Sequence, residues 1–223
     1  MNTATLIAPE VGEKIFLDYF SQKIYAEGWL GSAFIKDNES KTIKAFFISD
    51  NMEIVGDQEK TEEGWYLQLI TRNRLFFDQR MKDDPVLLFE LSIMKIAVDE
   101  EGLFSDIQKT AKMYISSFEP GKSRIEEIQK SFRKAVIATE SCKENNGNLS
   151  TIIIISKVGE MLELLFLKNQ KPFPGTVYGY RHYRDLENLP IGFSETFESF
   201  LELSEPIMKT ERFSHCVQLL TNL

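Results

Sequence analysis

The chain has 223 residues, of which 43% are hydrophobic and 27% charged, a composition typical of a globular protein with a substantial core. Its net charge of −8 and pI of about 5.0 argue against non-specific nucleic-acid binding, because phosphate neutralisation needs an excess of Lys and Arg. No apolar run approaches the roughly 20 residues that span a bilayer, and the first residues lack a basic, apolar signal segment. Two cysteines make no disulfide framework. We therefore expect a cytoplasmic protein without a membrane span.

The first hundred residues predict one helix and then an antiparallel sheet. Apolar residues recur at helical spacing over residues 9–27, and Gly28 suits the helix end. Short apolar runs separated by polar turns then predict four to six strands. These strands are expected at residues 32–36, 43–49, 65–70, 74–79 and 86–98, with a bulge or bend near Ser92 or Lys95 in the last one.

Residues 99–148 change to a helical period. Ser105 precedes Gln108, and Ser123 precedes Glu126, at the three-residue spacing of a capping box. The pattern predicts two helices separated by Pro120-Gly121. The polar segment 143–148 follows and is the expected linker.

The block 150–203 is expected to organise the second half of the chain. Two apolar runs, at residues 151–156 and 161–167, predict buried strands, and an aromatic run at 176–180 predicts a third. Ser194 is a suitable N-cap for a helix with a Phe-rich face. A last helix is predicted over residues 207–222.

These elements predict an α+β protein with antiparallel sheets packed against several helices. We expect an N-terminal α+β region at residues 1–145 and a C-terminal strand-hairpin-helix region at 146–223. One continuous domain is the alternative.

The residues that commonly carry catalysis are sparse. His182 and His215 have no metal-ligand spacing, and the glycines form no phosphate-binding fingerprint. Asp83-Asp84 and residues 99–101 could bind a cation, but both fall in expected turns. A Cys142–His pair could form only through the fold. We expect no cofactor and no metal site.

Two basic clusters interrupt the acidic sequence. The first consists of Arg72, Arg74, Arg80 and Lys82 around residues 75–77, and such mixtures of basic and aromatic side chains can bind phosphate or nucleic acid. The second lies at the end of an expected strand, and Tyr and Arg are favoured anchors of protein interfaces. We predict that the second cluster contacts a protein partner; its residues are Tyr178, Tyr180, Arg181, His182, Tyr183 and Arg184.

Residues 150–203 also resemble the C-terminal end of the SUKH superfamily. The resemblance is carried by residues 175–182, which read GTVYGYRH, and 191–201, which read IGFSETFESFL, together with the two expected strands before them. Many members are bacterial immunity proteins that bind and neutralise a toxin, often a nuclease. The helix before Asn146-Gly147 departs from the family pattern, and the first 100 residues have no recognised counterpart.

The sequence thus predicts a non-enzymatic protein-binding protein, in its most specific form an immunity factor that neutralises a basic toxin. An acidic protein would attract a basic partner. A bacterial effector or regulatory protein that binds a cellular target is one alternative. An enzyme with a dispersed site is another, and the oligomeric state stays open.

Overall fold

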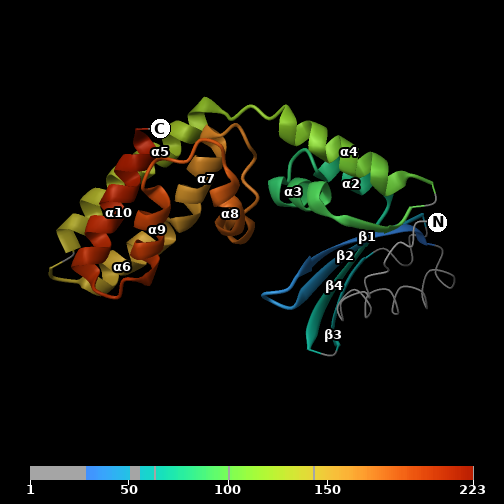
Figure 1. Cartoon of the computed structure of the whole chain (residues 1–223), viewed down its shortest axis with the longest axis horizontal. Helices are drawn as coiled ribbons and strands as arrows, with labels where there is room; N and C mark the ends of the chain where they lie inside the picture. The colour runs from blue at the N-terminus through green and yellow to red at the C-terminus, as the bar shows by residue number, and fades with distance from the viewer. Residues whose placement is uncertain (1–28, 51–55, 63, 100, 143, 223) are drawn as a thin grey trace, which may run out of the picture. The chain divides into compact units, whose positions relative to one another are not determined.

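The computed structural model describes residues 29–50, 56–62, 64–99, 101–142 and 144–222 (Figure 1). The chain forms two compact units: unit 1 ends at Tyr114, and unit 2 comprises Ile115–Leu223. This division precedes the expected one at residue 145, so the long helix before that residue belongs to unit 2. The helix expected at residues 9–27 lies outside the described residues.

Unit 1 contains a five-stranded sheet with the strand order β3-β4-β2-β1-β5. The strands are β1 (Trp29–Asp37), β2 (Thr42–Ser49), β3 (Gly56–Glu62), β4 (Trp65–Arg72) and β5 (Lys95–Val98). The α+β class is confirmed, and so are the expected strands at 32–36, 43–49 and 65–70. The sheet is mixed, because β2 pairs with β4 in parallel while the other neighbours are antiparallel. The sequence pattern missed β3, a polar strand at the sheet edge.

Of the strands expected in unit 1, the one at 74–79 is wrong, and the one at 86–98 is correct only for its last residues, which form β5. Residues 74–79 lie in α2 (Arg74–Arg80), and residues 86–93 lie in α3 (Pro85–Ile93). Local capping explains both helices: Asn73 accepts a hydrogen bond from the Phe76 amide, and Asp84 accepts from two amides of the first α3 turn. Pro85 occupies the first helical position, where its missing N–H costs nothing. The bend expected near Ser92 or Lys95 is the passage from α3 into β5.

The sheet has two different faces. Phe46 of β2 meets Phe77 of α2, which in turn meets Phe104 of α4 (Leu103–Ser116), so these helices cover one face. The opposite face carries a separate apolar cluster that includes Ile43 and Leu67. Neighbouring residues in each strand therefore face different surroundings, as the alternation of a pleated strand requires.

In the described residues of unit 2, all regular elements are helices. Its helices are α5 (Lys122–Cys142), α6 (Gly147–Ser156), α7 (Val158–Lys168), α8 (Thr176–His182), the 3-10 helix η1 (Tyr183–Asp185), α9 (Phe193–Glu202) and α10 (Pro206–Thr221). The three strands expected at 151–156, 161–167 and 176–180 are wrong; they are α6, α7 and α8. The apolar runs are short and nearly continuous, so periodicity alone does not distinguish a buried helix from a buried strand. The helices expected near Ser194 and at 207–222 are confirmed as α9 and α10. Ser194 is not the N-cap, because α9 begins at Phe193 and its N-cap is Gly192, in the left-handed conformation.

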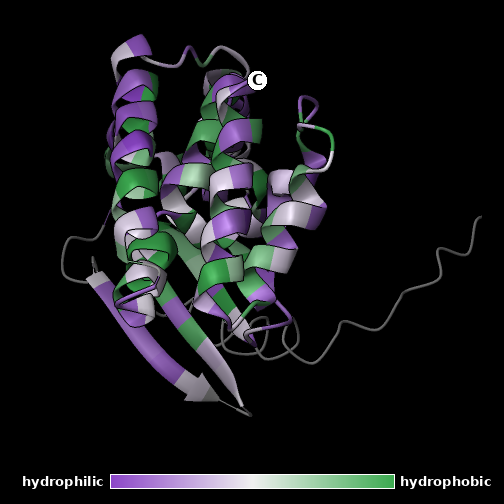
Figure 2. Cartoon of the chain, turned by 90° about the vertical axis from the view of Figure 1, so that its left-hand side faces the viewer, coloured by the Kyte–Doolittle hydropathy of each residue, from purple (hydrophilic) through white to green (hydrophobic). Residues whose placement is uncertain are grey.

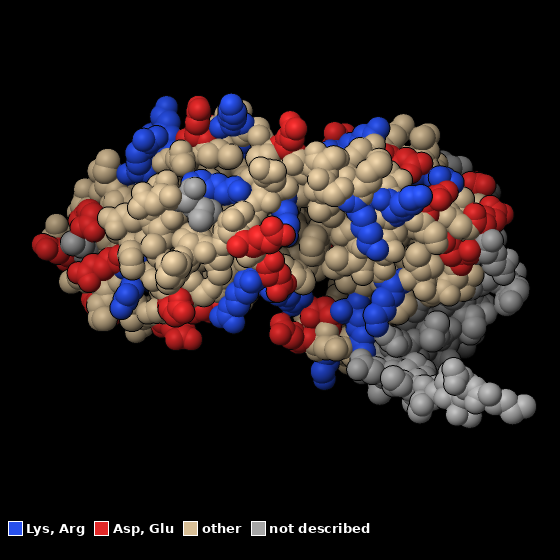
Figure 3. All heavy atoms as spheres, turned by 45° about the horizontal axis from the view of Figure 1, so that its top comes forward, with Lys and Arg blue, Asp and Glu red and all other residues tan. Residues whose placement is uncertain are grey.

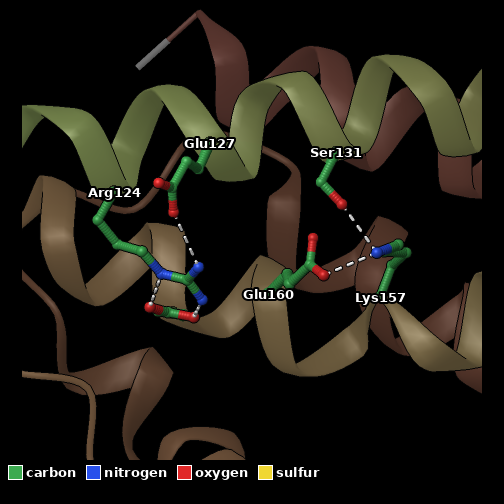
Figure 4. A network of polar contacts seen from close by, with 6 residues as sticks. Arg124, Glu127, Ser131, Lys157 and Glu160 are labelled. Atoms are coloured by element: carbon green, nitrogen blue, oxygen red, sulfur yellow. Dashed lines mark hydrogen bonds and ion pairs between the residues drawn. The ribbon is translucent and has the colours of Figure 1, made fainter.

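Helix α7 lies at the centre of unit 2, and polar contacts fix it to α5. From Leu162 to Leu167, every residue of α7 is buried except Glu163. Glu163 accepts two hydrogen bonds from the Arg124 guanidinium of α5 (Figure 4). One turn away, Lys157 binds Ser131 of α5 and Glu160 of α7 (Figure 4). None of the helices in the described residues is long and apolar enough to cross a membrane.

Candidate functional site

Three side chains of α8 and η1 converge on a carboxylate of α9. Glu198 accepts hydrogen bonds from Tyr183 Oη at 2.5 Å and from Tyr180 Oη at 3.0 Å. The Arg184 guanidinium donates to Glu198 at 2.8 Å and to Tyr183 Oη at 3.2 Å. Both tyrosine rings also pack on Phe197, with centroids 6.3 and 5.5 Å from it. This Glu198 cluster (Tyr180, Tyr183, Arg184 and Glu198) fastens the α8–η1 segment to α9.

The electrostatics of the Glu198 cluster favour an ionised carboxylate and neutral phenols. Burial alone would raise the pKa of Glu198, but hydrogen bonds from the two tyrosines and the charge of Arg184 hold that pKa below its ordinary value. Burial, followed by the hydrogen bond to Glu198, raises the pKa of Tyr183. The hydrogen bond to Glu198 is the main cause of the raised pKa of Tyr180. The cluster is therefore internally satisfied at neutral pH.

The six residues predicted to contact a partner do not form one exposed face. Tyr183 is buried, whereas Tyr180 and Arg184 are exposed; Tyr178, Arg181 and His182 are half-buried. His182 Nδ1 lies 3.2 Å from Asp185 Oδ2, a pair within one turn. All six lie in α8 and η1 and not at a strand end. Their role in partner binding stays a prediction, and much of their polar chemistry is used to join η1 to α9.

The other candidates from the sequence have local structural roles. Asp84 caps α3, and Asp99 accepts hydrogen bonds from the Phe104 and Ser105 amides at the start of α4. Cys142 and Cys216 are free thiols, of which Cys216 is buried. Among the described residues, no group of three or more His, Cys, Asp or Glu side chains could hold a metal ion.

Helix α6 presents an apolar face that the sequence analysis did not identify as a surface. Its ten residues, GNLSTIIIIS, include no charged side chain. Ile154 and Ser150 face the bundle, where Ser150 Oγ lies 2.8 Å from Thr210 Oγ1 of α10. On the opposite side, Leu149, Ile152 and Ile155 are 44%, 64% and 57% exposed. These three residues, spaced by three positions, form one outward stripe, which we call the α6 face. Figure 2 colours the helices of unit 2 by hydropathy, seen from the left-hand side of Figure 1.

Helix α6 packs against two other helices that also expose apolar side chains. At Gly147, the first residue of α6, an added Cβ would lie 2.7 Å from Pro206 of α10, so the two helix starts are in close contact. The next two residues of α10, Ile207 and Met208, are exposed. Helix α5 contributes Ile137, which is 69% exposed and lines a groove of about 610 Å³ between α5 and α10. The other residues that line this groove are Gln129, Arg133, Val136, Ser214, Val217, Gln218 and Thr221.

The apolar run at residues 151–155 is the sequence signal that could have indicated the α6 face. A strand buried on both sides, which this run predicts, would place all four consecutive isoleucines in the core. In a helix the same residues point in several directions, and only some can face the bundle. When such an uncharged run forms a short helix at the surface, the isoleucines that do not face the bundle are left exposed.

Comparison with known proteins yields only distant structural resemblance. No family model and no curated protein matches the chain. Among solved structures, the chain is similar to a nucleotidyltransferase-like protein from Exiguobacterium sibiricum, at 11% sequence identity and a TM-score of 0.47. The match covers 94% of this chain and 74% of that one. A match at this level assigns neither a family nor an activity.

Proposed function

We propose that the protein is a protein-binding protein that docks its partner on the α6 face of unit 2. The observation that supports this proposal is the exposure of Leu149, Ile152 and Ile155 on a helix without charged residues. A surface helix ordinarily carries charged or polar residues on its outer face, whereas a helix that is apolar all round is ordinarily buried. A partner that covers the α6 face would complete this burial.

The composition of the α6 face is that of the centre of a protein interface. Interface cores are depleted of charged residues, and exposed apolar patches commonly mark sites of association. The stripe from Leu149 to Ile155 is only about 9 Å long at 1.5 Å per residue. A stable interface buries roughly 800 Å² on each partner. The interface with the partner must therefore include other exposed residues. Ile207 and Met208 of α10 are the first candidates, because they directly follow Pro206, which lies against the start of α6.

The charge of the protein is unevenly distributed, which bears on the partner. Residues 115–223 contain 13 Lys and Arg against 14 Asp and Glu, so unit 2 is close to neutral. The remaining residues contain 13 Lys and Arg against 20 Asp and Glu, and they carry nearly all of the net charge of −8. We infer a basic partner with an apolar contact face. Attraction by the acidic part would speed its approach, and the neutral α6 face would hold it.

Neutralisation of a basic toxin is the most specific form of this proposal. The SUKH resemblance suggested it, but the strands on which that resemblance partly depended are helices α6, α7 and α8. The remaining support for an immunity role is therefore the acidic charge of the protein and the apolar α6 face. A regulatory or effector protein that binds a basic cellular target would use the same surface.

The test is affinity purification of the tagged full chain from its native cells, followed by reconstitution with the purified candidate partner. We expect a stoichiometric complex with a basic protein that the Ile152→Lys variant does not form. A charge at the centre of an apolar contact leaves a desolvated, unpaired ammonium group, so affinity should fall by about 100-fold or more. Ile191→Lys is the matched control, because Ile191 is 97% exposed and lies in the loop before α9.

Three results would contradict the proposal. The reconstituted complex could retain its affinity with Ile152→Lys, or lose it equally with Ile191→Lys. The chain could also form a dimer by light scattering that Ile152→Lys dissociates, in which case a second copy covers the α6 face. Circular dichroism of each variant checks that unit 2 remains folded.

A further inference from the structure

Unit 1 contains a small charged pocket on the helix-covered side of its sheet. The pocket has a volume of about 180 Å³. Strands β2, β3 and β4 and helices α2 and α3 contribute its lining residues: Lys44, Asp57, Ile70, Arg72, Phe76, Arg80, Asp84, Val86, Leu87 and Glu90. Figure 3 shows Lys and Arg side chains on the helical side of unit 1. The pocket gathers Arg72 and Arg80 of the first basic cluster with Lys44, which lies 28 residues before Arg72 in the sequence.

One ion pair fixes the interior of the pocket. Lys44 of β2 lies 2.5 Å from Glu90 of α3, whose side chain is only 4% exposed. A buried carboxylate needs such a partner, because an unpaired buried charge is costly. This pair joins the sheet to α3 and leaves little net charge at the base of the pocket.

Arg72 is held in a fixed orientation at the pocket wall. One of its terminal nitrogens donates to the Thr71 carbonyl at 2.8 Å, and the other contacts Asp57 of β3 at 2.8 Å. The guanidinium also lies over the Phe76 ring, 5.0 Å from its centroid. The Arg72 side chain is 19% exposed, whereas Asp57 is 54% exposed. Arg72 is therefore preorganised, and its acidic partner is the more replaceable member of the pair.

Arg80 supplies a second cation without a matching carboxylate. It lies in the last turn of α2 and lines the pocket, yet no described carboxylate forms an ion pair with it. The nearby Asp84 uses one oxygen to accept the Val86 and Leu87 amides at the start of α3. Of the acidic residues in the pocket, Glu90 and Asp84 are thus committed to the fold, and Asp57 is the exchangeable one.

We propose that this pocket binds a phosphate group, which bridges Arg72 and Arg80 and replaces Asp57 as the partner of Arg72. The planar fork of Arg is suited to tetrahedral oxyanions, to which it donates two parallel hydrogen bonds. A volume of 180 Å³ is several times that of one water, but it lies below the roughly 300 Å³ of the smallest common drug-sized sites. The pocket therefore fits a phosphate group and not a whole nucleotide.

The test is a calorimetric titration of the full chain with inorganic phosphate, with phosphoserine as a phosphomonoester and with acetate as a singly charged control. We expect saturable binding of at least one phosphate compound with a 1:1 stoichiometry and no saturable binding of acetate. Arg72→Gln should weaken the binding by about tenfold or more, since charge-assisted hydrogen bonds are lost. Asp57→Asn should strengthen it by roughly two- to fivefold, because the competing carboxylate of an exposed ion pair is removed.

Lys60→Gln is the matched control for Arg72→Gln. Lys60 lies on β3 opposite Leu67 and therefore on the other face of the sheet, and its substitution removes the same charge. Tighter binding of phosphoserine than of phosphate identifies a phosphorylated molecule as the ligand, and equal affinity identifies free phosphate; both support the site. The proposal is overturned if neither compound saturates at about 10 mM, a concentration well above typical ligand-binding constants. It is also overturned if Lys60→Gln weakens binding as much as Arg72→Gln does, or if Asp57→Asn does not strengthen it.

Discussion

Arg124 and Glu163 join α5 to α7 through two parallel hydrogen bonds, 2.7 Å from Nε and 2.8 Å from the terminal nitrogen (Figure 4). The two residues are 39 positions apart in sequence, and Glu163 is 19% exposed. Glu127 adds a weaker contact with Arg124 at 3.4 Å. This two-point geometry is stronger and more specific than a single exposed ion pair.

Arg124→Ala should therefore lower the free energy of unfolding of unit 2 by about 1 kcal/mol, the upper part of the range for partly exposed pairs. Lys122→Ala, at the exposed start of the same helix, should change it by less than about 0.5 kcal/mol. Urea denaturation followed by circular dichroism measures both values. Equal effects of the two substitutions would show that the Arg124–Glu163 contact adds nothing beyond the loss of a charge.

Stability at acid pH should depend on Glu198. Because its pKa is lower in the folded protein than in the unfolded chain, its contribution is complete above the unfolded value of about 4.3 and is lost as the pH falls through the folded pKa. The unmodified chain should therefore lose more stability between pH 5 and 3 than the Glu198→Gln variant does. Urea midpoints measured across this range test the prediction. Glu187→Gln, in an exposed loop, should keep the pH dependence of the unmodified chain.

Gly147 should resist substitution because α6 and α10 meet at its position. An added Cβ would lie 2.7 and 2.8 Å from two carbons of the Pro206 ring, which cannot rotate away. Gly147→Ala should destabilise unit 2 by about 1–3 kcal/mol, the usual cost of overpacking. Gly121→Ala is the control, since its Cβ would meet only Ser123 Oγ at 3.9 Å. Thermal unfolding of both variants gives the comparison, and a neutral Gly147→Ala would show that the two helix starts are not in close contact.

The two thiols should react at very different rates. Cys216 is fully buried in α10, and burial raises its pKa to about 12, so almost none of it is thiolate at pH 8. Cys142 is half-buried at the end of α5. Iodoacetamide should therefore modify one thiol of the folded chain and the second only in urea, as mass spectrometry of intact protein and peptides would show. Rapid labelling of Cys216 in the native Cys142→Ser variant would contradict its burial.

Sequence patterns predicted the fold best where the local signal was unambiguous. Short apolar runs separated by polar turns predicted β1, β2 and β4. Helical spacing predicted α4 and α5, but the expected capping serines, Ser105 and Ser123, lie inside these helices, which begin at Leu103 and Lys122. Asn73 and Asp84-Pro85 are also N-terminal helix signals, but the apolar residues that follow them favour strands. In the structure both segments are helices that begin at these caps.

The candidate sites could be predicted only in part. The sequence grouped Tyr180, Tyr183 and Arg184, but nothing in it indicated that Glu198 would accept hydrogen bonds from all three. The sequence also grouped Arg72 with Arg80. Lys44 and Glu90 line the same pocket only because β2 pairs with β4 and α3 packs beside them. Contacts between distant segments depend on tertiary packing, which residue spacing does not encode.

The α+β class, strands β1, β2 and β4, the Phe-rich face of α9 and the acidic charge were predictable from the sequence, because they follow from composition and short-range periodicity. The helical state of residues 151–167 was not, since an apolar run buried on most sides satisfies either period. The sequence also did not indicate which isoleucines of α6 face outward. That outcome depends on where α5 and α10 lie against α6, a matter of packing between segments up to 60 residues apart, such as Ser150 and Thr210.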